Sequence, residues 1–200
     1  MMKRIIALIL VLVTALAISS CSLFAKDLGT TDGSATIEDY NDAIKNTTPN
    51  KVTILTEYQN INPEITLSGE YIVTYNVDGT ATVNYSYESL APIGSESLME
   101  VKSGTAEVSS NGKVTGSLDK LVAATVAKQV QLNKKKMEYT ISMGVLNAVV
   151  KAEDTQKILG TAIGADASID MRITDDGKIG SYSINYATST GMAYIICIYN

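Results

Sequence analysis

The chain has 200 residues, 46% of them hydrophobic, with 16 basic and 21 acidic side chains and no histidine. A chain of this length accommodates one ordinary domain. Without histidine it lacks a Ser-His-Asp or Cys-His nucleophile, an imidazole base and an ordinary zinc site. We therefore expect a protein that is not an enzyme and that uses no metal or cofactor.

The first twenty residues have the pattern of an export signal. Lys3 and Arg4 precede an almost unbroken apolar run over residues 5–18. A run of about 14 residues is too short to span about 30 Å of hydrocarbon as a helix, which takes about 20. The run leads into Ile18-Ser19-Ser20-Cys21, which resembles the lipobox of bacterial lipoproteins. In a lipobox the cysteine thiol receives a diacylglyceryl group. We predict a signal peptide over residues 1–20 and lipidation of Cys21; the alternative is a plain signal peptide with a chance cysteine.

Residues 21–35 are expected to form a lipidated, flexible tether ahead of one domain over residues 36–200. Small polar residues and two glycines occupy much of residues 22–34, and a coil of about 13 residues spans roughly 20 Å on average. Loss of Lys3 and Arg4 with the signal leaves 14 basic and 21 acidic residues, a net charge of −7. Such a domain is repelled by nucleic acid and by anionic headgroups. We expect an extracytoplasmic protein, held at the bacterial cell membrane by acylated Cys21 and without a nucleic-acid partner.

The first predicted element of the domain is a helix that begins after Thr36. Thr36 is a suitable N-cap with Asp39 three residues further on. Ile37, Tyr40 and Ile44 form an apolar stripe at helical spacing. The following Asn-Thr-Thr-Pro sequence, residues 46–49, ends the helix.

From Val52 onward the apolar period falls to two, and two long antiparallel strands are predicted on either side of residues 77–79. Both apolar sets have odd numbers, so facing residues must have numbers with an even sum. A three-residue loop with Gly79 in the left-handed conformation satisfies this condition. The resulting pairs are Gly69 with Tyr87, Tyr71 with Tyr85, Val73 with Val83, and Tyr75 with Ala81.

The middle of the chain has weaker patterns. They predict one or two strands between Leu98 and Val114 that hinge at Asn111-Gly112, and a helix after Ser117 whose helical spacing runs from Leu118 to Leu132. They also predict a hairpin around Gly144 and a short helix from Glu153 that ends before Gly160. Ser117 and Lys120 also fit the S-x-x-K pattern of penicillin-recognising enzymes. The companion motifs of those enzymes are absent in the required order, so we interpret Ser117 as the N-cap of the helix.

Two hairpins close the chain. A two-residue Asp176-Gly177 turn would pair Met171 with Tyr182 and Ile169 with Ile184. A three-residue loop over residues 189–191 would then pair Tyr186 with Tyr194 and Ile184 with Ile196. The last strand is apolar on both faces, and Cys197 on it is interpreted as a small core residue. Once Cys21 is acylated, Cys197 has no partner for a disulfide.

The strand pattern places seven tyrosines on one inward face. Each hydroxyl needs a partner when it is buried, so this face suits a partly wet groove or a ligand cavity. The alternative is that the rings pack inside the core with their hydroxyls at its rim. The candidate cavity residues are Tyr71, Val73, Tyr75, Tyr85, Tyr87, Tyr182, Ile184, Tyr186, Tyr194 and Ile196.

The layout combines a lipobox, a tether, the helix IEDYNDAIKNT, the hairpin ITLSGEYIVTYNVDGTATVNYSY and the segment VLNAVVKAEDTQKILG before two closing hairpins. This order resembles the LolA/LolB and LppX/LprG-like lipoproteins. The resemblance implies an α+β fold in which a curved antiparallel β half-barrel of about eight to ten strands wraps around two or three short helices. It also implies a non-enzymatic lipoprotein that binds a lipid or another apolar ligand in the half-barrel cavity. The alternative hypothesis is an interaction or sensor module that contacts an envelope protein without a ligand.

Overall fold

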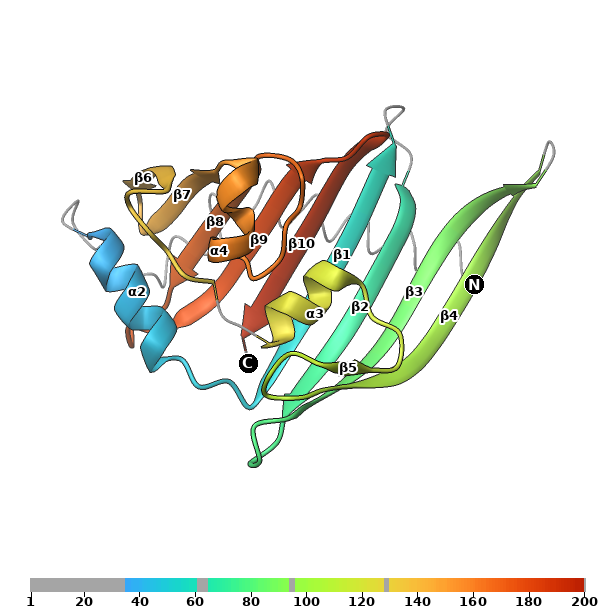
Figure 1. Ribbon diagram of the computed structural model, residues 1–200, viewed down its shortest axis with the longest axis horizontal. Helices are drawn as coiled ribbons and strands as arrows, with labels where there is room; N and C mark the ends of the chain where they lie inside the picture. The colour runs from blue at the N-terminus through green and yellow to red at the C-terminus, as the bar shows by residue number, and fades with distance from the viewer. Residues whose placement is uncertain (1–34, 61–64, 94–95, 128–129, 200) are drawn as a thin grey trace.

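A computed structural model describes residues 35–60, 65–93, 96–127 and 130–199. Their strands form one ten-stranded antiparallel sheet in the order β5-β4-β3-β2-β1-β10-β9-β8-β7-β6 (Figure 1). The strands are β1 (Lys51–Asn60), β2 (Ile65–Tyr75), β3 (Ala81–Ile93), β4 (Glu96–Val108), β5 (Val114–Thr115), β6 (Met137–Ser142), β7 (Val145–Val150), β8 (Ala167–Ile173), β9 (Ile179–Ala187) and β10 (Gly191–Tyr199). The first and last strands lie side by side in the middle of the sheet.

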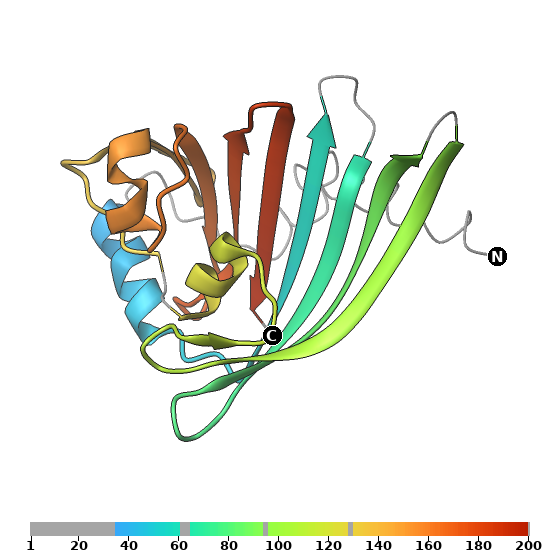
Figure 2. The same cartoon turned by 45° about the vertical axis from the view of Figure 1, so that its right-hand side comes forward.

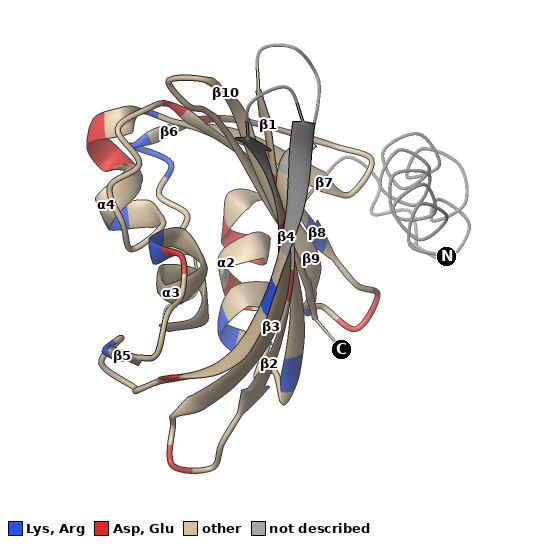
Figure 3. Ribbon diagram, turned by 90° about the vertical axis from the view of Figure 1, so that its right-hand side faces the viewer, with Lys and Arg blue, Asp and Glu red and all other residues tan. Residues whose placement is uncertain are grey.

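The sheet is curved and not closed, and its helices lie on one side of it (Figures 2 and 3). They are α2 (Ile37–Asn46), α3 (Lys120–Ala127), the 3-10 turn η1 (Ala152–Asp154) and α4 (Thr155–Ile158). This arrangement confirms the expected α+β half-barrel. Within the described ranges, no helix has the length and apolar character to cross a membrane. The predicted signal peptide, the site of lipidation and nearly all of the tether fall outside the described residues.

The first helix has the predicted cap. Thr36 Oγ1 accepts a hydrogen bond from Asp39 N (3.4 Å), and Thr36 N donates one to Asp39 Oδ2 (2.6 Å). At the other end, the Thr47 hydroxyl donates to Ala43 O (2.7 Å) and accepts from Ile179 N (2.8 Å). The second bond fastens the end of α2 to the first residue of β9, which fixes the helix against the inner face of the sheet.

The register of β2 and β3 is confirmed at each of the four predicted pairs, including Tyr71 with Tyr85. Asn76 N donates to Thr80 O (2.8 Å) across the three-residue loop. Gly79 has φ +81°, the left-handed conformation that the loop requires.

The pairs predicted between β8 and β9 are also observed, but the predicted two-residue turn is wrong. Thr174 N donates to Lys178 O (2.7 Å), so residues 175–177 form a three-residue loop. A register shift between Arg172 and Ile173 then leaves Gly180 as an extra residue on β9. Beyond this bulge the numbers of two facing residues have an odd sum, as the apolar pairs require. One extra residue in the strand shifts the register by the same amount as a turn shorter by one residue.

The register predicted between β9 and β10 is wrong by one residue. Tyr186 faces Ala193 instead of Tyr194, and Ile184 faces Ile195 instead of Ile196. Thr188 N donates to Gly191 O (2.8 Å), so the loop has two residues, not three. A shift of one residue turns every side chain to the other face. Because β10 is apolar on both faces, alternation could not choose between the two registers.

The middle elements are observed where they were expected, with two corrections. The helix after Ser117 ends at Ala127, so Leu132 lies outside it. Asp119 Oδ1 accepts hydrogen bonds from Leu121 N (2.8 Å) and Val122 N (3.2 Å), so Asp119 and not Ser117 caps α3. The β6–β7 hairpin turns at Met143 and Gly144, which both have positive φ, as a type I′ turn requires.

One continuous apolar core joins the sheet to the helices. On the sheet side it contains the inward residues of β10 at Ile195 and Cys197, both of which are fully buried. On the helix side it contains residues such as Tyr40, Val122 and Ile158. The prediction that Cys197 is a core residue is confirmed.

Candidate functional site

On the β1–β3 part of the sheet, only one end of the inner face is covered. Along β1, Val52, Ile54 and Thr56 are buried, whereas Tyr58, the next inward residue, is half-buried. Along β3, Val83 is likewise buried and the inward residues beyond it are half-buried. The uncovered end is therefore where β1 ends and β2 begins, at the top of Figure 1.

Five tyrosines from four strands lie on the inner face toward this end, and we call them the tyrosine surface. They are Tyr58 on β1, Tyr71 on β2, Tyr85 and Tyr87 on β3, and Tyr186 on β9. The ring centroids of Tyr71 and Tyr85 are 6.2 Å apart. Those of Tyr85 and Tyr87 are 6.0 Å apart, with an angle of 17° between the ring planes. The rings thus form a continuous aromatic row across β2 and β3.

Two glycines let the rings lie close to the sheet. A Cβ atom at Gly104 would lie 2.6 Å from Tyr85 Oη, and one at Gly69 would lie 3.0 Å from Tyr71 Cε2. Tyr85 therefore covers its cross-strand neighbour Gly104, and Tyr71 leans back over Gly69 on its own strand. Tyr87 faces Gly69 in the register, as predicted, but the ring nearest to the Gly69 position is that of Tyr71.

Tyr58 and Tyr186 meet above a small residue. Both face Ala193 on the intervening strand β10, which is fully buried. Alanine leaves room for the two rings to approach each other over the strand, and the Tyr58 and Tyr186 hydroxyls form a hydrogen bond. The Tyr58 hydroxyl also lies 3.5 Å from Asp119 Oδ2, at the start of α3.

The phenol groups next to Asp119 stay neutral. Burial raises the pKa of Tyr58, Tyr71 and Tyr186, and the Asp119 carboxylate raises each of them further. A negative charge close by disfavours a phenolate. The surface therefore presents hydroxyls and ring faces beside one carboxylate.

One buried polar atom lies beside these rings. Thr56 is 4% exposed, and its hydroxyl lies against the Tyr71 side chain. This oxygen would be 2.8 Å from a Cβ atom at Gly69, so it borders the same spot as the Tyr71 ring.

The structure separates the ten candidate cavity residues into three groups. Four of them belong to the tyrosine surface: Tyr71, Tyr85, Tyr87 and Tyr186. Another four lie further down the inner face, where the helices cover it: Val73, Tyr75, Tyr182 and Ile184. The last two, Tyr194 and Ile196, are on the outer face because of the register of β10.

Two site residues were not predicted from the sequence. Tyr58 was missed although Val52, Ile54, Thr56 and Tyr58 alternate regularly, and this alternation was a usable signal. Asp119 was missed because only the packing of α3 brings it to the sheet.

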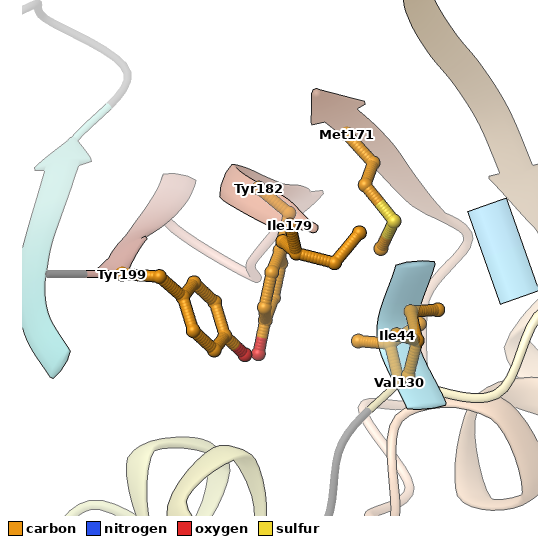
Figure 4. A pocket seen from close by; sticks show the side chains of 6 residues that line it. All are labelled: Ile44, Val130, Met171, Ile179, Tyr182 and Tyr199. Atoms are coloured by element: carbon orange, nitrogen blue, oxygen red, sulfur yellow. The ribbon is translucent and has the colours of Figure 1, made fainter. Parts of the chain in front are cut away.

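A small cavity lies under the helices (Figure 4). Its volume is about 10 Å³, and its walls are Ile44, Val130, Met171, Ile179, Tyr182 and Tyr199. The Tyr182 and Tyr199 hydroxyls lie next to each other at its wall (Figure 4). A space of this size holds no more than about one water molecule, so it does not enclose an acyl chain.

Metal-ligating side chains do not gather in the described part of the chain: no three His, Cys, Asp or Glu side chains lie close enough together to hold an ion.

No protein-family model and no curated protein matches the chain. Among solved structures, LprF from Mycobacterium bovis is similar over 80% of this chain and 89% of its own, with 14% identity and a TM-score of 0.39. The S-type phycobiliprotein lyase CPES from Guillardia theta is similar over 84% of this chain and 94% of its own, with 9% identity and a TM-score of 0.32. A mutant of the fluorescent protein UnaG is similar over 82% and 99%, with 9% identity and a TM-score of 0.22. These values assign no family to the chain.

Proposed function

We propose that this chain is a lipid-anchored, extracytoplasmic protein of the bacterial envelope that binds an apolar or amphiphilic ligand on its tyrosine surface. The observation that carries the proposal is the uncovered end of the inner face, where five tyrosines, four of them partly exposed, lie on a concave sheet. Tyrosine offers an apolar ring and a polar hydroxyl, so a surface of tyrosines suits a ligand with both characters. The lipobox at Cys21 supports the anchor.

The open surface is a better site than the interior of the half-barrel. The cavity under the helices has about 10 Å³, whereas a benzene-sized ligand occupies a cavity of about 150 Å³. A ligand inside would have to displace buried side chains of α2 or of the sheet, such as Ile44 and Met171. A ligand on the tyrosine surface needs no such rearrangement, because Tyr58, Tyr85, Tyr87 and Tyr186 are already partly exposed.

The ligand proposal is tested with a chain that begins at Ser22, which keeps the whole described sheet, its helices and its core. Titration with the neutral fluorescent probe N-phenyl-1-naphthylamine is expected to give saturable binding. Tyr85→Leu is expected to weaken this binding, because it removes the middle ring of the row. Tyr194→Leu is the matched control on the outer face. No saturable binding, or equal effects of the two substitutions, would contradict the proposal.

The anchor is tested with the full chain in a bacterial host. The parent protein is expected in the membrane fraction and in the detergent phase of a Triton X-114 partition. Cys21→Ala is expected to leave the detergent phase, because the thiol that carries the acyl chains is gone. Equal partition of the two proteins would refute the lipid anchor.

A specific observation also favours the alternative, an interaction module. Strand β5 pairs only with Glu107 and Val108, so no described strand lies beside the rest of β4's outer edge. Val101 on this edge is 52% exposed. An open edge can accept a strand from a partner protein. A photo-crosslinker at Val101 would then capture one partner in the envelope, a crosslinker at the exposed hairpin residue Val77 would not, and Tyr85→Leu would leave the capture unchanged.

A further inference from the structure

The tyrosine surface is electrostatically uneven. Asp119 Oδ2 lies 3.5 Å from the Tyr58 hydroxyl on β1, while Lys102 on β4 faces Tyr87 in the register. Strands β1 and β4 are three strand spacings apart, roughly 14 Å at about 4.8 Å each. One end of the surface thus carries a carboxylate and the opposite end an ammonium group. Asp119 is the nearer of the two charges to Tyr58, so its charge dominates the end formed by Tyr58 and Tyr186.

The carboxylate is held in place. Asp119 Oδ1 accepts hydrogen bonds from Leu121 N (2.8 Å) and Val122 N (3.2 Å), which fix the side chain at the start of α3. Its other oxygen is turned to Tyr58. The α3 backbone therefore orients the negative charge toward the rings before any ligand arrives. A preorganised side chain loses little conformational entropy on binding.

The chemistry of the neighbouring groups favours an organic cation over a metal ion. Aromatic faces attract large, weakly hydrated cations such as quaternary ammonium groups. Three tyrosine side chains and one carboxylate meet here, and no cluster of three metal ligands exists among the described residues. The mature chain's predicted net charge of −7 also draws cations toward the protein.

We infer that the tyrosine surface binds the cationic head of an amphiphile. The ammonium group lies between Asp119 and the partly exposed rings of Tyr58 and Tyr186, and the apolar part extends over Tyr85 and Tyr87. This inference rests on the proposed function and specifies its ligand class. A cation placed there meets the Asp119 charge and the ring faces together, while an anion meets only repulsion.

The test uses the chain that begins at Ser22 and three six-carbon probes: hexyltrimethylammonium, hexyl sulfate and 1-hexanol. Titration calorimetry or NMR shifts are expected to show the cation binding at least about tenfold more tightly than hexyl sulfate. Asp119→Asn keeps an oxygen for the α3 cap and is expected to weaken binding of hexyltrimethylammonium by about three- to tenfold. Asp175→Asn, on the β8–β9 loop, also removes one negative charge and is expected to change this affinity by less than about twofold.

The outcomes separate the inference from the proposed function. If hexyl sulfate or 1-hexanol binds the tyrosine surface as tightly as the cation, the cationic ligand class is refuted and the apolar binding function stands. Equal weakening by Asp119→Asn and Asp175→Asn also refutes it, because only the net charge would then matter. If neither the three probes nor N-phenyl-1-naphthylamine binds, the proposed function itself fails.

Discussion

Gly69→Ala and Gly104→Ala add the same methyl group beneath two tyrosine rings that differ in their freedom to move. Neither glycine has a positive φ, so alanine is compatible with the backbone at both positions. At Gly104 the new Cβ would lie 2.6 Å from Tyr85 Oη, and ordinary contact begins at 3.4 Å. The end of the ring must therefore move by about 0.8 Å. Tyr85 is half-buried, with an open side toward solvent, so the shift costs little.

At Gly69 the same methyl group meets packed neighbours. It would lie 2.8 Å from Thr56 Oγ1 and 3.0 Å from Tyr71 Cε2. Thr56 is 4% exposed and Tyr71 is 5% exposed, so neither can move without disturbing the core. Overpacking of this kind costs about 1–3 kcal/mol. Replacing glycine by alanine also stabilises the protein by about 0.4–1 kcal/mol at either site, because it lowers the conformational entropy of the unfolded chain. We expect Gly69→Ala to be destabilising and Gly104→Ala to lie within about 1 kcal/mol of the parent.

Urea unfolding followed by far-ultraviolet circular dichroism measures the difference. With a slope of about 1–3 kcal/mol/M, a loss of about 2 kcal/mol lowers the midpoint by about 0.7–2 M. Gly104→Ala should leave the midpoint nearly unchanged but weaken N-phenyl-1-naphthylamine binding, because the Tyr85 ring is lifted from the sheet. A loss of stability at Gly104 that equals or exceeds the loss at Gly69 would refute the assignment of Tyr85 to a free surface and Tyr71 to the core.

Three further predictions follow from burial. Ile195 is fully buried, so Ile195→Ala should lower the free energy of unfolding by about 2–5 kcal/mol. Ile196→Ala on the outer face should lower it by less than about 1.5 kcal/mol. Equal losses in urea unfolding would overturn the observed β10 register. In the chain that begins at Ser22, Cys197 should resist Ellman's reagent at pH 8 in the folded state and react fully in urea; rapid labelling of the folded protein would argue against its burial. Burial raises the pKa of Tyr75 and of Cys197 to about 12. Unfolding restores the ordinary pKa values of both groups, so at high pH the unfolded chain releases protons that the folded chain keeps. These groups should leave the free energy of unfolding unaffected below pH 9 and lower it as the pH rises toward 12. Urea midpoints over that range measure the effect.

The sequence patterns predicted most of the elements because local rules governed them. Thr36 with Asp39 identified the start of α2 through two hydrogen bonds within one turn. The β2–β3 register followed from counting, since Gly79 allowed one loop length and each strand had one apolar face. Where a strand had one apolar face and one polar face, the alternation of apolar and polar residues was sufficient to predict which residues face inward.

Prediction failed where two solutions had the same local signature. The extra residue at Gly180 gives the same pairs as a two-residue turn, so the pattern could not distinguish a bulge from a tight loop. On β10, Ile195 and Ile196 are equally apolar, and only the position of the strand in the sheet, with helices on one side, decides which is buried. The contribution of Asp119 to the site depends on how α3 docks, which is a tertiary contact between residues 61 positions apart.

The pairing of β1 with β10 also sets the order of assembly. Strands β1 to β5 form one run of neighbours in chain order, and β6 to β10 form a second; among the described strands, the ladder from Val52 opposite Tyr199 to Asn60 opposite Gly191 is what unites them. A contact between strands more than a hundred residues apart forms late and slowly. Neither run can complete the common core until the final segment has emerged and docked. The half-barrel therefore remains open until β10 is in place, and deletion of β10 would remove the ladder that joins the two runs of strands.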